Sequence, residues 1–366
     1  MKSKSLRWLA RLGMAILALI IILVGTLLMI EWRPDPLEDT PVTPGRDTAA
    51  APPEAGAELS LVSWNLGYAG LDAKADFFMD GGKQVRPPDR DRVEENLKAM
   101  AVWLAAHPAD VILLQEVDFD SSRTWGMDQS RVIGAALPAY FQARALNFKV
   151  AYIPYPLSEP LGRMNSGLLS LSRAKPSRAI RHQLPGDYPW PVRVFHLKRC
   201  LHELRLPAPD GKDWVFLHLH LSAFDKGGEL RTQQMEYLRR LMQRLYAEGH
   251  HVVVAGDWNH APPGLAVDHF PHTDPTPFWF QQVPEGWTPK GWTWAWDPKV
   301  PSLRATDAPY TPGKSFLTTV DNLLLGPDVE LIQVKTVDLG FEHTDHQPVQ
   351  AHLRLKSPSA PPAPPG

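Results

Sequence analysis

The sequence predicts a mixed α/β (α+β) domain, because strand-like apolar runs alternate with amphipathic helical runs over most of the chain. Residues 59–65 alternate as in a strand, and residues 91–107 carry apolar side chains at helical spacing. Residues 250–256 are apolar on both faces, as in a strand of a helix-covered sheet. With 366 residues and 44% hydrophobic content, the chain can bury a large core. We therefore expect one sizeable domain, at residues 58–356.

The first element is a charge-free apolar segment at residues 12–30. As a helix rising ~1.5 Å per residue it would be about 28 Å long, close to the hydrocarbon thickness of a bilayer. Cations in residues 1–11 precede it and Glu31 follows, so the positive-inside rule puts the N-terminus in the cytoplasm. A cleaved signal peptide is the alternative, although no small-residue cleavage motif follows promptly. We expect an uncleaved single-pass anchor in the cell membrane, with the domain outside the cytoplasm, periplasmic or extracellular.

Segments rich in Pro and Ala flank the domain. Residues 31–57 predict an extended spacer that holds the domain off the membrane, and residues 357–366 predict a disordered tail. The net charge is −2, and four cations lie in residues 1–11, so the remainder sums to about −6. This acidic balance argues against tight non-specific duplex binding, without excluding a nuclease with a local basic groove. The single cysteine, Cys200, forms no intrachain disulfide, and no protein partner is indicated.

Polar residues end several of the strand-like runs within the domain. These runs and their polar residues are 59–65 with Asn65, 111–117 with Glu116, 215–224 with His220, and 250–257 with Asp257 followed by Asn259. Two helical runs lie between them: residues 91–107, where Asp91 and Glu94 predict a capping box, and residues 228–249. We expect the polar strand ends to converge at one rim of the domain.

Each of these residues alone is weak evidence, because a polar strand end is more often a turn or cap residue. The ordered set is more specific: Ser63-Trp64-Asn65, Leu114-Gln115-Glu116, Asn165-Ser166-Gly167, His220-Leu221-Ser222, Gly256-Asp257-Trp258-Asn259, Asp321-Asn322 and Thr344-Asp345-His346. On these motifs the chain resembles the endonuclease/exonuclease/phosphatase superfamily over residues 58–356. The resemblance implies a deoxyribonuclease I-like, four-layer sandwich of two mainly antiparallel sheets covered by helices, with the site at one end.

The resemblance also implies divalent-metal chemistry on a phosphoester. Glu116 would be the principal metal carboxylate, Asn65 its companion, directly or through water, and Asp345 would lie on the metal side of the cleft. Asp257 would orient or deprotonate the attacking water, while Asn259 would hold a non-bridging oxygen. Oxygen ligands of this kind suit one or two Mg²⁺ or Mn²⁺ ions, which neutralise phosphoryl oxygens.

The remaining matched residues are histidines and their partner. By resemblance, His346 would contact the phosphoryl group or serve as an acid or base, and Asp321 would fix its tautomer. His220 matches a phosphate-contacting histidine of the family.

Three further residues are weaker candidates for substrate binding. His218 stands where many sphingomyelinase-type relatives have Asn in Asn-Thr-His, and it is either a donor behind the site or a satisfied core histidine. Asn165 is either a phosphate contact or a residue that shapes the backbone. Arg304, with Lys314, is a candidate for holding an extra substrate anion, by position only.

An aromatic segment precedes Asp321. Its tryptophans either form a wall for a lipid, a sugar or stacked bases, or brace a long loop against the sandwich. They are Trp287, Trp292, Trp294 and Trp296.

Three functions follow as alternatives. The first is a metal-dependent phosphodiesterase or phosphatase acting outside the cytoplasm on a lipid or other membrane-proximal phosphoester, which the anchor and the aromatic segment favour. The second is an extracytoplasmic nuclease of the same mechanism, acting on nucleic acid. The third is a non-enzymatic binding module, which is disfavoured because every matched catalytic position holds the required residue type.

Overall fold

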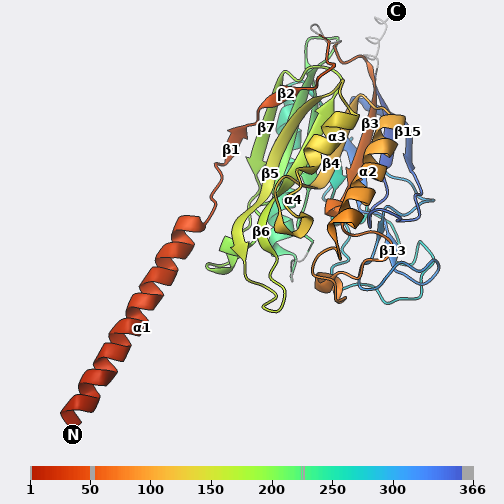
Figure 1. Cartoon of the computed structure of the whole chain (residues 1–366). Coiled ribbons are helices and arrows are strands. Elements are labelled where there is room, and N and C mark those ends of the chain that lie inside the picture. The colour runs from red at the N-terminus through yellow and green to blue at the C-terminus, as the bar shows by residue number, and fades with distance from the viewer. Residues whose placement is uncertain (1, 50–53, 224, 226, 357–366) are drawn as a thin grey trace, which may run out of the picture.

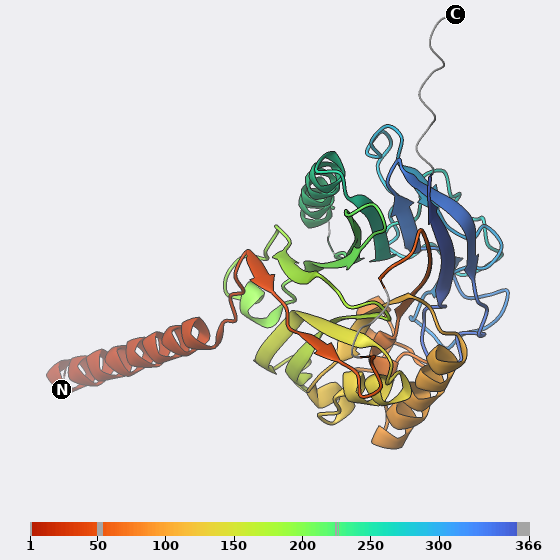
Figure 2. The ribbon, with the colours of Figure 1, turned by 90° about the horizontal axis from the view of Figure 1, so that it is seen from above.

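The computed structural model describes residues 2–49, 54–223, 225 and 227–356. Its body consists of two seven-stranded sheets packed face to face, with helices on the outer faces (Figures 1 and 2). This architecture confirms the predicted α/β sandwich of the deoxyribonuclease I type. The predicted disordered tail, 357–366, lies outside the described residues, as do residues 50–53 of the predicted spacer.

The first sheet has the strand order β1-β7-β8-β9-β10-β14-β11. Its strands are β1 (Leu37–Asp39), β7 (Arg178–Gln183), β8 (Cys200–Pro207), β9 (Asp213–His220), β10 (His251–Asp257), β11 (Thr293–Ala295) and β14 (Asp321–Leu325). Neighbouring strands are antiparallel except for β9 and β10, which are parallel.

The second sheet has the order β15-β16-β3-β4-β6-β5-β2. Its strands are β2 (Val42–Pro44), β3 (Glu58–Asn65), β4 (Val111–Asp118), β5 (Phe141–Ile153), β6 (Gly162–Ser172), β15 (Val329–Thr336) and β16 (Val349–Leu355). Its one parallel pair is β3 with β4. A small antiparallel ribbon joins β12 (Leu303–Arg304) to β13 (Leu317–Thr318).

Four α-helices accompany the sheets in the described residues. They are α1 (Lys2–Ile30), α2 (Arg90–Ala106), α3 (Gln129–Ala136) and α4 (Glu229–Ala247), with short 3-10 helices η1 (Gly67–Ala69), η2 (Phe78–Asp80), η3 (Ser122–Thr124) and η4 (Val192–Phe195). The start of α2 corrects one expectation: its cap is Asp89, whose side chain accepts a hydrogen bond from Arg92 N at 2.8 Å. The predicted capping box of Asp91 and Glu94 is wrong, since Glu94 instead pairs with Arg90 at 2.6 Å.

Strand alternation divides the core into layers. On β3, Leu61 faces the interior between the sheets with Phe216 of β9, while Val62 and Trp64 face outward and pack under α2 and α3. The outer face of the first sheet packs against α4 through a separate cluster that includes Leu238. Burying each large apolar side chain stabilises the fold by about 1.5–3 kcal/mol. Each sheet is therefore stabilised by apolar packing on both of its faces.

Parallel strand pairing places the polar carboxyl ends of several strands at the same edge of the sandwich. Because β3 runs parallel to β4, and β9 parallel to β10, the carboxyl ends of each pair lie at the same edge of its sheet. The β10 strand of one sheet also lies against β3 and β4 of the other. The ends at Asn65, Glu116, His220 and Asp257 are thereby brought to one edge of the sandwich.

The N-terminal region differs in part from its prediction. The α1 helix stands away from the body (Figure 1), and its segment Leu6–Ile30 is long and apolar enough to cross a membrane, a property that membrane anchors and signal sequences share. The spacer prediction is wrong for residues 37–44, because β1 pairs with β7 and β2 pairs with β5. Both are short edge strands, where proline is tolerated.

Candidate active site

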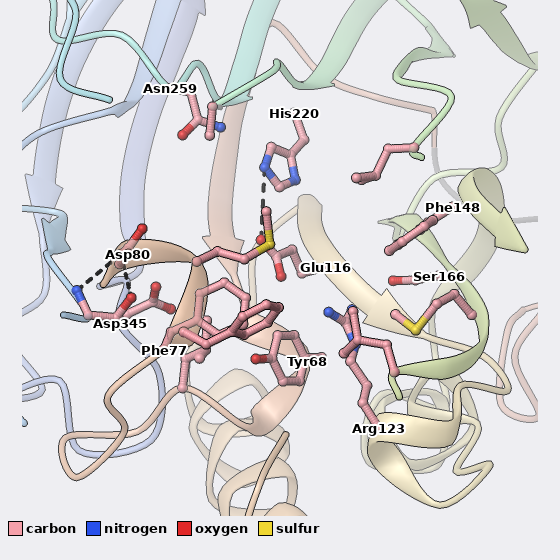
Figure 3. A pocket seen from close by; sticks show the side chains of 18 of the residues that line it. Tyr68, Phe77, Asp80, Glu116, Arg123, Phe148, Ser166, His220, Asn259 and Asp345 are labelled. Carbon is pink, nitrogen blue, oxygen red and sulfur yellow. Dashed lines mark hydrogen bonds and ion pairs between the residues drawn. The ribbon is translucent and has the colours of Figure 1, made fainter. Parts of the chain in front are cut away.

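A cavity of about 440 Å³ opens where β3, β4, β9 and β10 end. The predicted catalytic and metal-binding residues in its lining are Glu116, His220, Asp257, Asn259, Asp345 and His346, and the predicted substrate-binding residue Arg304 also lines it. Asn65 and Asp321 lie directly behind them, hydrogen-bonded to Asp257 and His346 respectively. We name these eight predicted catalytic and metal-binding residues the cavity floor. Figure 3 shows Glu116 near the centre, with His220 above it and Asp345 to one side.

Glu116 reaches the cavity through an irregularity in β4. The register with β6 shifts between Leu114 and Val117, and Glu116 has φ 52°. A bulge of this kind re-aims a side chain, and a left-handed backbone is strained for any residue with a Cβ. Gln115 therefore points between the sheets, while the Glu116 side chain faces the cavity and remains 26% exposed.

Asn65, the last residue of β3, links the groups of the floor. Its Nδ2 donates to Asp257 Oδ2 at 2.9 Å and lies 3.4 Å from Glu116 Oε1 and 3.3 Å from His346 Nε2. Its Oδ1 accepts a hydrogen bond from Gly67 N at 2.9 Å. In this arrangement Asn65 orients the carboxylates, and a cation would meet it only indirectly.

His220 and Asp257 face each other across the parallel strand pair. His220 Nε2 lies 3.3 Å from Asp257 Oδ2 and 3.9 Å from Glu116 Oε1. The close approach of the strands requires Gly256, where φ is 137° and a Cβ would lie 2.1 Å from Leu219 O. The Gly-Asp-x-Asn motif thus begins with a residue that lets β10 pack against β9.

Burial gives these two side chains opposite protonation behaviour. It raises the pKa of Asp257 to about 7, with Asp321 adding to the rise and His346 opposing it. It also lowers the pKa of His220 well below its usual value, and the charges of Arg199 and His346 lower it further. At neutral pH His220 is therefore a neutral imidazole beside a carboxyl group that titrates near 7.

His346 is held by Asp321 from the end of β14. Its Nδ1 donates to Asp321 Oδ2 at 2.8 Å, and its Nε2 lies 3.8 Å from Asp257 Oδ2. Burial opposes the charged form, but Asp321, Asp345 and Asp257 together raise the pKa of His346 to about 10. His346 is therefore an imidazolium that can donate from both ring nitrogens. The geometry is the one expected for a carboxylate that fixes the orientation of a histidine.

Several of the floor carboxylates could hold a metal ion. Asp257, Asp321 and His346 each offer a ligand atom within 4.8 Å of one another. Because a protonated His346 has no lone pair for a cation, the oxygens of Glu116 and Asp345 fit better. Burial raises the pKa of Asp345 to about 6, with His346 opposing the rise and Glu116 adding to it, so a cation beside Asp345 would favour its ionised form. Such an oxygen donor set suits Mg²⁺ or Mn²⁺.

Asn259 is a second strained residue on the floor. Its φ is 49°, its backbone N donates to Asp257 Oδ1 at 2.8 Å, and its Nδ2 donates to Leu221 O at 2.9 Å. The other N–H of this amide has no partner among the described residues and borders the cavity. It can therefore donate to a substrate oxygen.

Two of the weaker sequence candidates point away from the cavity. His218 lies between the sheets, bonded to Gln115 Nε2 at 2.7 Å and to Ser170 Oγ at 2.9 Å. It is a satisfied core histidine, and its prediction as a substrate contact is wrong. Asn165 is likewise absent from the cavity lining, because the alternation of β6 turns its neighbour Ser166 toward the cavity instead (Figure 3).

Arg304, the predicted anion-binding residue, uses both terminal nitrogens of its guanidinium within the fold. Arg304 borders the cavity, but its Nη1 donates to Ala305 O at 2.9 Å and its Nη2 to Asp72 O at 2.5 Å. The guanidinium is thus used to hold the loop around η1 in place. Sequence position indicated a nearby cation, but it contained no information about these backbone acceptors.

The aromatic segment mostly braces the fold. Trp287 and Trp294 pack against the buried Trp258, with ring centroids 6.0 and 4.6 Å from it, and Trp292 packs against Tyr246 of α4 at 6.1 Å. None of these side chains lines the cavity. The tryptophan wall is therefore not formed by this segment, although Trp279, earlier in the chain, does line the cavity.

The sequence did not reveal two features of the cavity. Its walls are strongly apolar, and their members include Leu71, Phe77, Phe78, Phe148, Ile153, Met164, Phe195, Trp279 and Leu303. Arg199 is also part of the lining. These residues come from many separate loops and strands, so no local pattern marks them.

Comparisons with known proteins agree with this architecture. A family model described as the Endonuclease/Exonuclease/phosphatase family matches residues 62–346. An endonuclease/exonuclease/phosphatase from Beutenbergia cavernae DSM 12333 superposes with a TM-score of 0.55 at 18% identity, covering 82% of this chain and 72% of that chain. No curated protein sequence matches the chain.

Two other solved structures have the same fold at lower identity. An endonuclease/exonuclease/phosphatase from Bacteroides vulgatus has a TM-score of 0.50 at 14% identity, over 82% of this chain and 99% of that chain. The human Nocturnin catalytic domain, solved with a bound sulfate anion, has a TM-score of 0.50 at 14% identity, over 87% of this chain and 97% of that chain. At such identities the likeness is one of fold.

Proposed function

Since the chain belongs to the endonuclease/exonuclease/phosphatase family, whose members are generally metal-dependent phosphoester hydrolases, we propose that it hydrolyses a lipid-type phosphoester outside the cytoplasm. The observation that carries this proposal is a single cavity with a charged floor and apolar walls. The floor would bind the phosphoryl group and the walls the apolar group esterified to it. The volume of about 440 Å³ falls within the roughly 300–1,000 Å³ typical of small-molecule sites.

Asp257 would activate the attacking water. Its Oδ2 faces the cavity between Asn65 and His220, and its Oδ1 accepts from Asn259 N at 2.8 Å, so the carboxylate is fixed in orientation. A general base works best when its pKa lies near the operating pH, and burial gives the carboxyl of Asp257 a pKa of about 7. We therefore assign it the role of base.

The other floor residues would stabilise charge that builds on the phosphoryl oxygens. His346 carries a positive charge and Asn259 has a free amide N–H, so both can donate to oxygens above Asp257. His220 Nε2, directed between Glu116 and Asp257, is the third donor. A divalent cation held by Glu116 and Asp345 would supply the Lewis acid that neutralises the phosphate.

Apolar residues at the cavity mouth favour a lipid over a nucleic acid. Met79, Tyr155 and Val192 line the cavity and are also 39%, 63% and 46% exposed. Large exposed apolar side chains around a binding site typically mark contact with a lipid or another apolar surface. A nuclease would need several free cations to follow a phosphate backbone. In this cavity the guanidiniums of Arg123 and Arg304 are already hydrogen-bonded, and among the three lining arginines only Arg199 makes no hydrogen bond or ion pair within the described residues.

The contacts that follow the N-terminal helix α1 support the proposal of a membrane-proximal substrate. Glu31, directly after α1, is 2% exposed and pairs with Arg193 Nε at 2.7 Å. Arg193 belongs to η4, whose Val192 and Phe195 line the cavity. If α1 crosses the membrane, this ion pair holds one wall of the cavity close to the bilayer surface. An alkaline phosphatase fusion to the C-terminus should then be active only when the domain is outside the cytoplasm.

The activity can be tested on the full chain in detergent micelles, because residues 37–44 pair with both sheets and should be retained. We expect bis(p-nitrophenyl) phosphate to be cleaved with Mg²⁺ or Mn²⁺ and not with EDTA, and Asp257→Asn to lose this turnover. Arg131→Gln, an exposed change on α3, serves as the control. No turnover with either metal, and no difference between the wild type and Asp257→Asn, would favour the binding-module alternative.

The substrate class needs a second comparison under one buffer. We expect mixed micelles containing phosphatidylinositol phosphates, phosphatidic acid or sphingomyelin to include a substrate with higher kcat/KM than plasmid DNA. Nicking of plasmid DNA that exceeds every lipid would replace this proposal with the extracytoplasmic nuclease.

A further inference from the structure

Three arginines line the cavity, and two of them have two guanidinium nitrogens each hydrogen-bonded within the fold. Arg123 makes a bidentate pair with Asp118, at 3.0 and 2.9 Å, and lies over the Tyr68 ring. Arg304 donates to the backbone carbonyls described above. These nitrogens of Arg123 and Arg304 could bind a ligand only by breaking those contacts, whereas Arg304 Nε is buried without a partner among the described residues.

Arg199 is different. Within the described residues its side chain makes no hydrogen bond or ion pair, and its Nη1 is buried without a partner. Burial lowers the pKa of Arg199, while Glu116 and Asp257 are the carboxylates that most favour its charged form. A guanidinium remains charged even when partly desolvated. A buried, unpaired guanidinium is therefore unfavourable unless a ligand supplies hydrogen-bond acceptors and a negative charge.

The backbone at Arg199 is held firmly. Lys198 N donates to Asn147 O at 2.7 Å, Leu184 N donates to Arg199 O at 3.0 Å, and Cys200 begins β8. The fold therefore fixes the position from which the side chain extends while leaving the guanidinium itself free. This is the arrangement of a pre-organised ligand-binding residue.

We propose that Arg199 binds the phosphate of the substrate and selects phosphoesters that join an anionic phosphate to an apolar group. The inference rests on the proposed function and adds a residue that would bind the negatively charged phosphate of the substrate. Arg199 lies in the same lining as the apolar Phe148, Met164 and Phe195. A planar guanidinium can donate two parallel hydrogen bonds to one phosphate, which a lysine ammonium cannot reproduce.

The charges nearby make this assignment specific. Arg199 lowers the pKa of His220 and is favoured by Glu116 and Asp257, so it lies within electrostatic reach of the floor. Arg199, Asp257 and His346 also belong to the lining of the same cavity, so we expect a phosphate bound beside Asp257 to contact Arg199 as well as His346. The residue is a positioning and specificity residue for binding, and Asp257 remains the base.

The test uses the full chain in detergent with Mg²⁺ and four variants, three at Arg199 and one at Arg163. Arg199→Gln should raise the KM for p-nitrophenyl phosphate at least tenfold, and raise the Ki of inorganic phosphate by a similar factor, with a smaller change in kcat. Arg199→Lys should recover part of the loss. Arg163→Gln, which alters an exposed arginine of β6, is the matched control and should leave KM and Ki unchanged.

A structural role predicts a different pattern. Because Arg199 has no partner to lose, Arg199→Met should keep or raise the melting temperature of the protein without ligand while weakening phosphate binding. A lowered melting temperature with unchanged Ki would overturn the proposal. So would unchanged KM and Ki in Arg199→Gln when the wild-type chain is active. If the wild-type chain turns over no phosphoester, the proposed function fails, while binding of inorganic phosphate, measured by calorimetry, still decides the role of Arg199.

Discussion

His218 and His220 stand two residues apart on β9 and point to the same side of the strand, but their surroundings differ completely. His218 lies in the interior between the sheets, within a hydrogen-bonded chain of polar residues that we name the interior network. Its members are Gln115, His218, Ser170, His202 and Thr40. His220 lies on the cavity floor, where its Nδ1 is buried without a partner among the described residues.

The interior network has one consistent direction. Gln115 Nε2 can only donate, so His218 accepts at Nε2 and donates from Nδ1 to Ser170. Ser170 then donates to His202 Nδ1, and His202 donates from Nε2 to Thr40 Oγ1. Burial lowers the pKa of His202 to about 3 and that of His218 well below its usual value, so both remain neutral. Such a network stabilises the core and offers nothing to a ligand.

The cavity floor is arranged in the opposite way. Glu116 and Asn259 hold left-handed backbone angles, and the pKa values of Asp257 and His346 are about 7 and 10. Strain and perturbed titration that the fold maintains around a cavity are typical of functional sites. Burial of a histidine therefore does not by itself indicate function, whereas polar groups left without hydrogen-bond partners beside a cavity do.

The largest effect that would test this contrast is expected at Asp257. Asp257→Asn keeps the size of the side chain but removes the base, so kcat should fall by about 10³-fold, within the range for general base catalysis. Hydrolysis of bis(p-nitrophenyl) phosphate measures it. A fall of less than tenfold would remove Asp257 from the catalytic role and leave the floor without a base.

The two histidines of β9 allow a matched test. His220→Ala should lower kcat/KM by about 10²-fold, as loss of one donor to the transition state does, with little change in stability. His218→Ala should leave kcat/KM within about twofold but lower the free energy of unfolding by about 2–4 kcal/mol, because it leaves a void and strands two polar partners. Urea denaturation and steady-state kinetics on the same samples separate the effects. The reverse pattern would contradict the comparison.

A smaller effect concerns the cation. Glu116→Gln keeps the shape of the side chain and removes one negative charge, so half-maximal activity should require at least about tenfold more Mg²⁺, as when a metal site is weakened. Titration of activity with Mg²⁺ from the EDTA-treated state measures this. Glu342→Gln, an exposed change away from the cavity, should leave the titration unchanged.

The smallest effect concerns a histidine outside both regions. Asp328 and Asp210 accept from His251 at 2.7 and 3.0 Å and raise its pKa above 6.5 despite partial burial. A raised folded-state pKa contributes stability below the unfolded value, near pH 6.5, which is lost as the pH rises through the folded value. The stability of the wild-type chain relative to His251→Asn should therefore shrink between pH 6 and pH 9, as urea midpoints would record. A constant difference would mean that the imidazole is neutral throughout.

Much of the fold and site follows from local patterns. The alternation of residues 59–65 and the apolar run at residues 111–117 predicted strands, and the ordered polar ends predicted which residues gather at the cavity. Asn65, Glu116, Asp257 and His346 do meet there, over distances of 2.9 to 3.8 Å between neighbouring side chains. Such residues are visible in the sequence because each sits at a strand end beside a recognisable motif.

The sequence did not show in which direction the side chains of the weaker substrate-binding candidates point. His218 has the same residue type and strand face as His220, but one step further from the strand end places it between the sheets. Asn165 and Ser166 differ by the alternation of β6, whose phase depends on its register with β5 and β4. Arg304 and Arg199 look alike in the sequence, and only backbone acceptors around Arg304 distinguish them.

The sequence by itself determined the fold class, the apolar N-terminal segment and the polar residues of the floor, because strand periodicity, hydropathy and short motifs are local properties of the chain. The tertiary structure alone decided that residues 37–44 join the sheets, that the cavity walls are apolar and that Arg199 is left unpaired. These features depend on contacts between segments far apart in the chain. A side chain acquires its partners, its burial and hence its charge state only when those segments pack together.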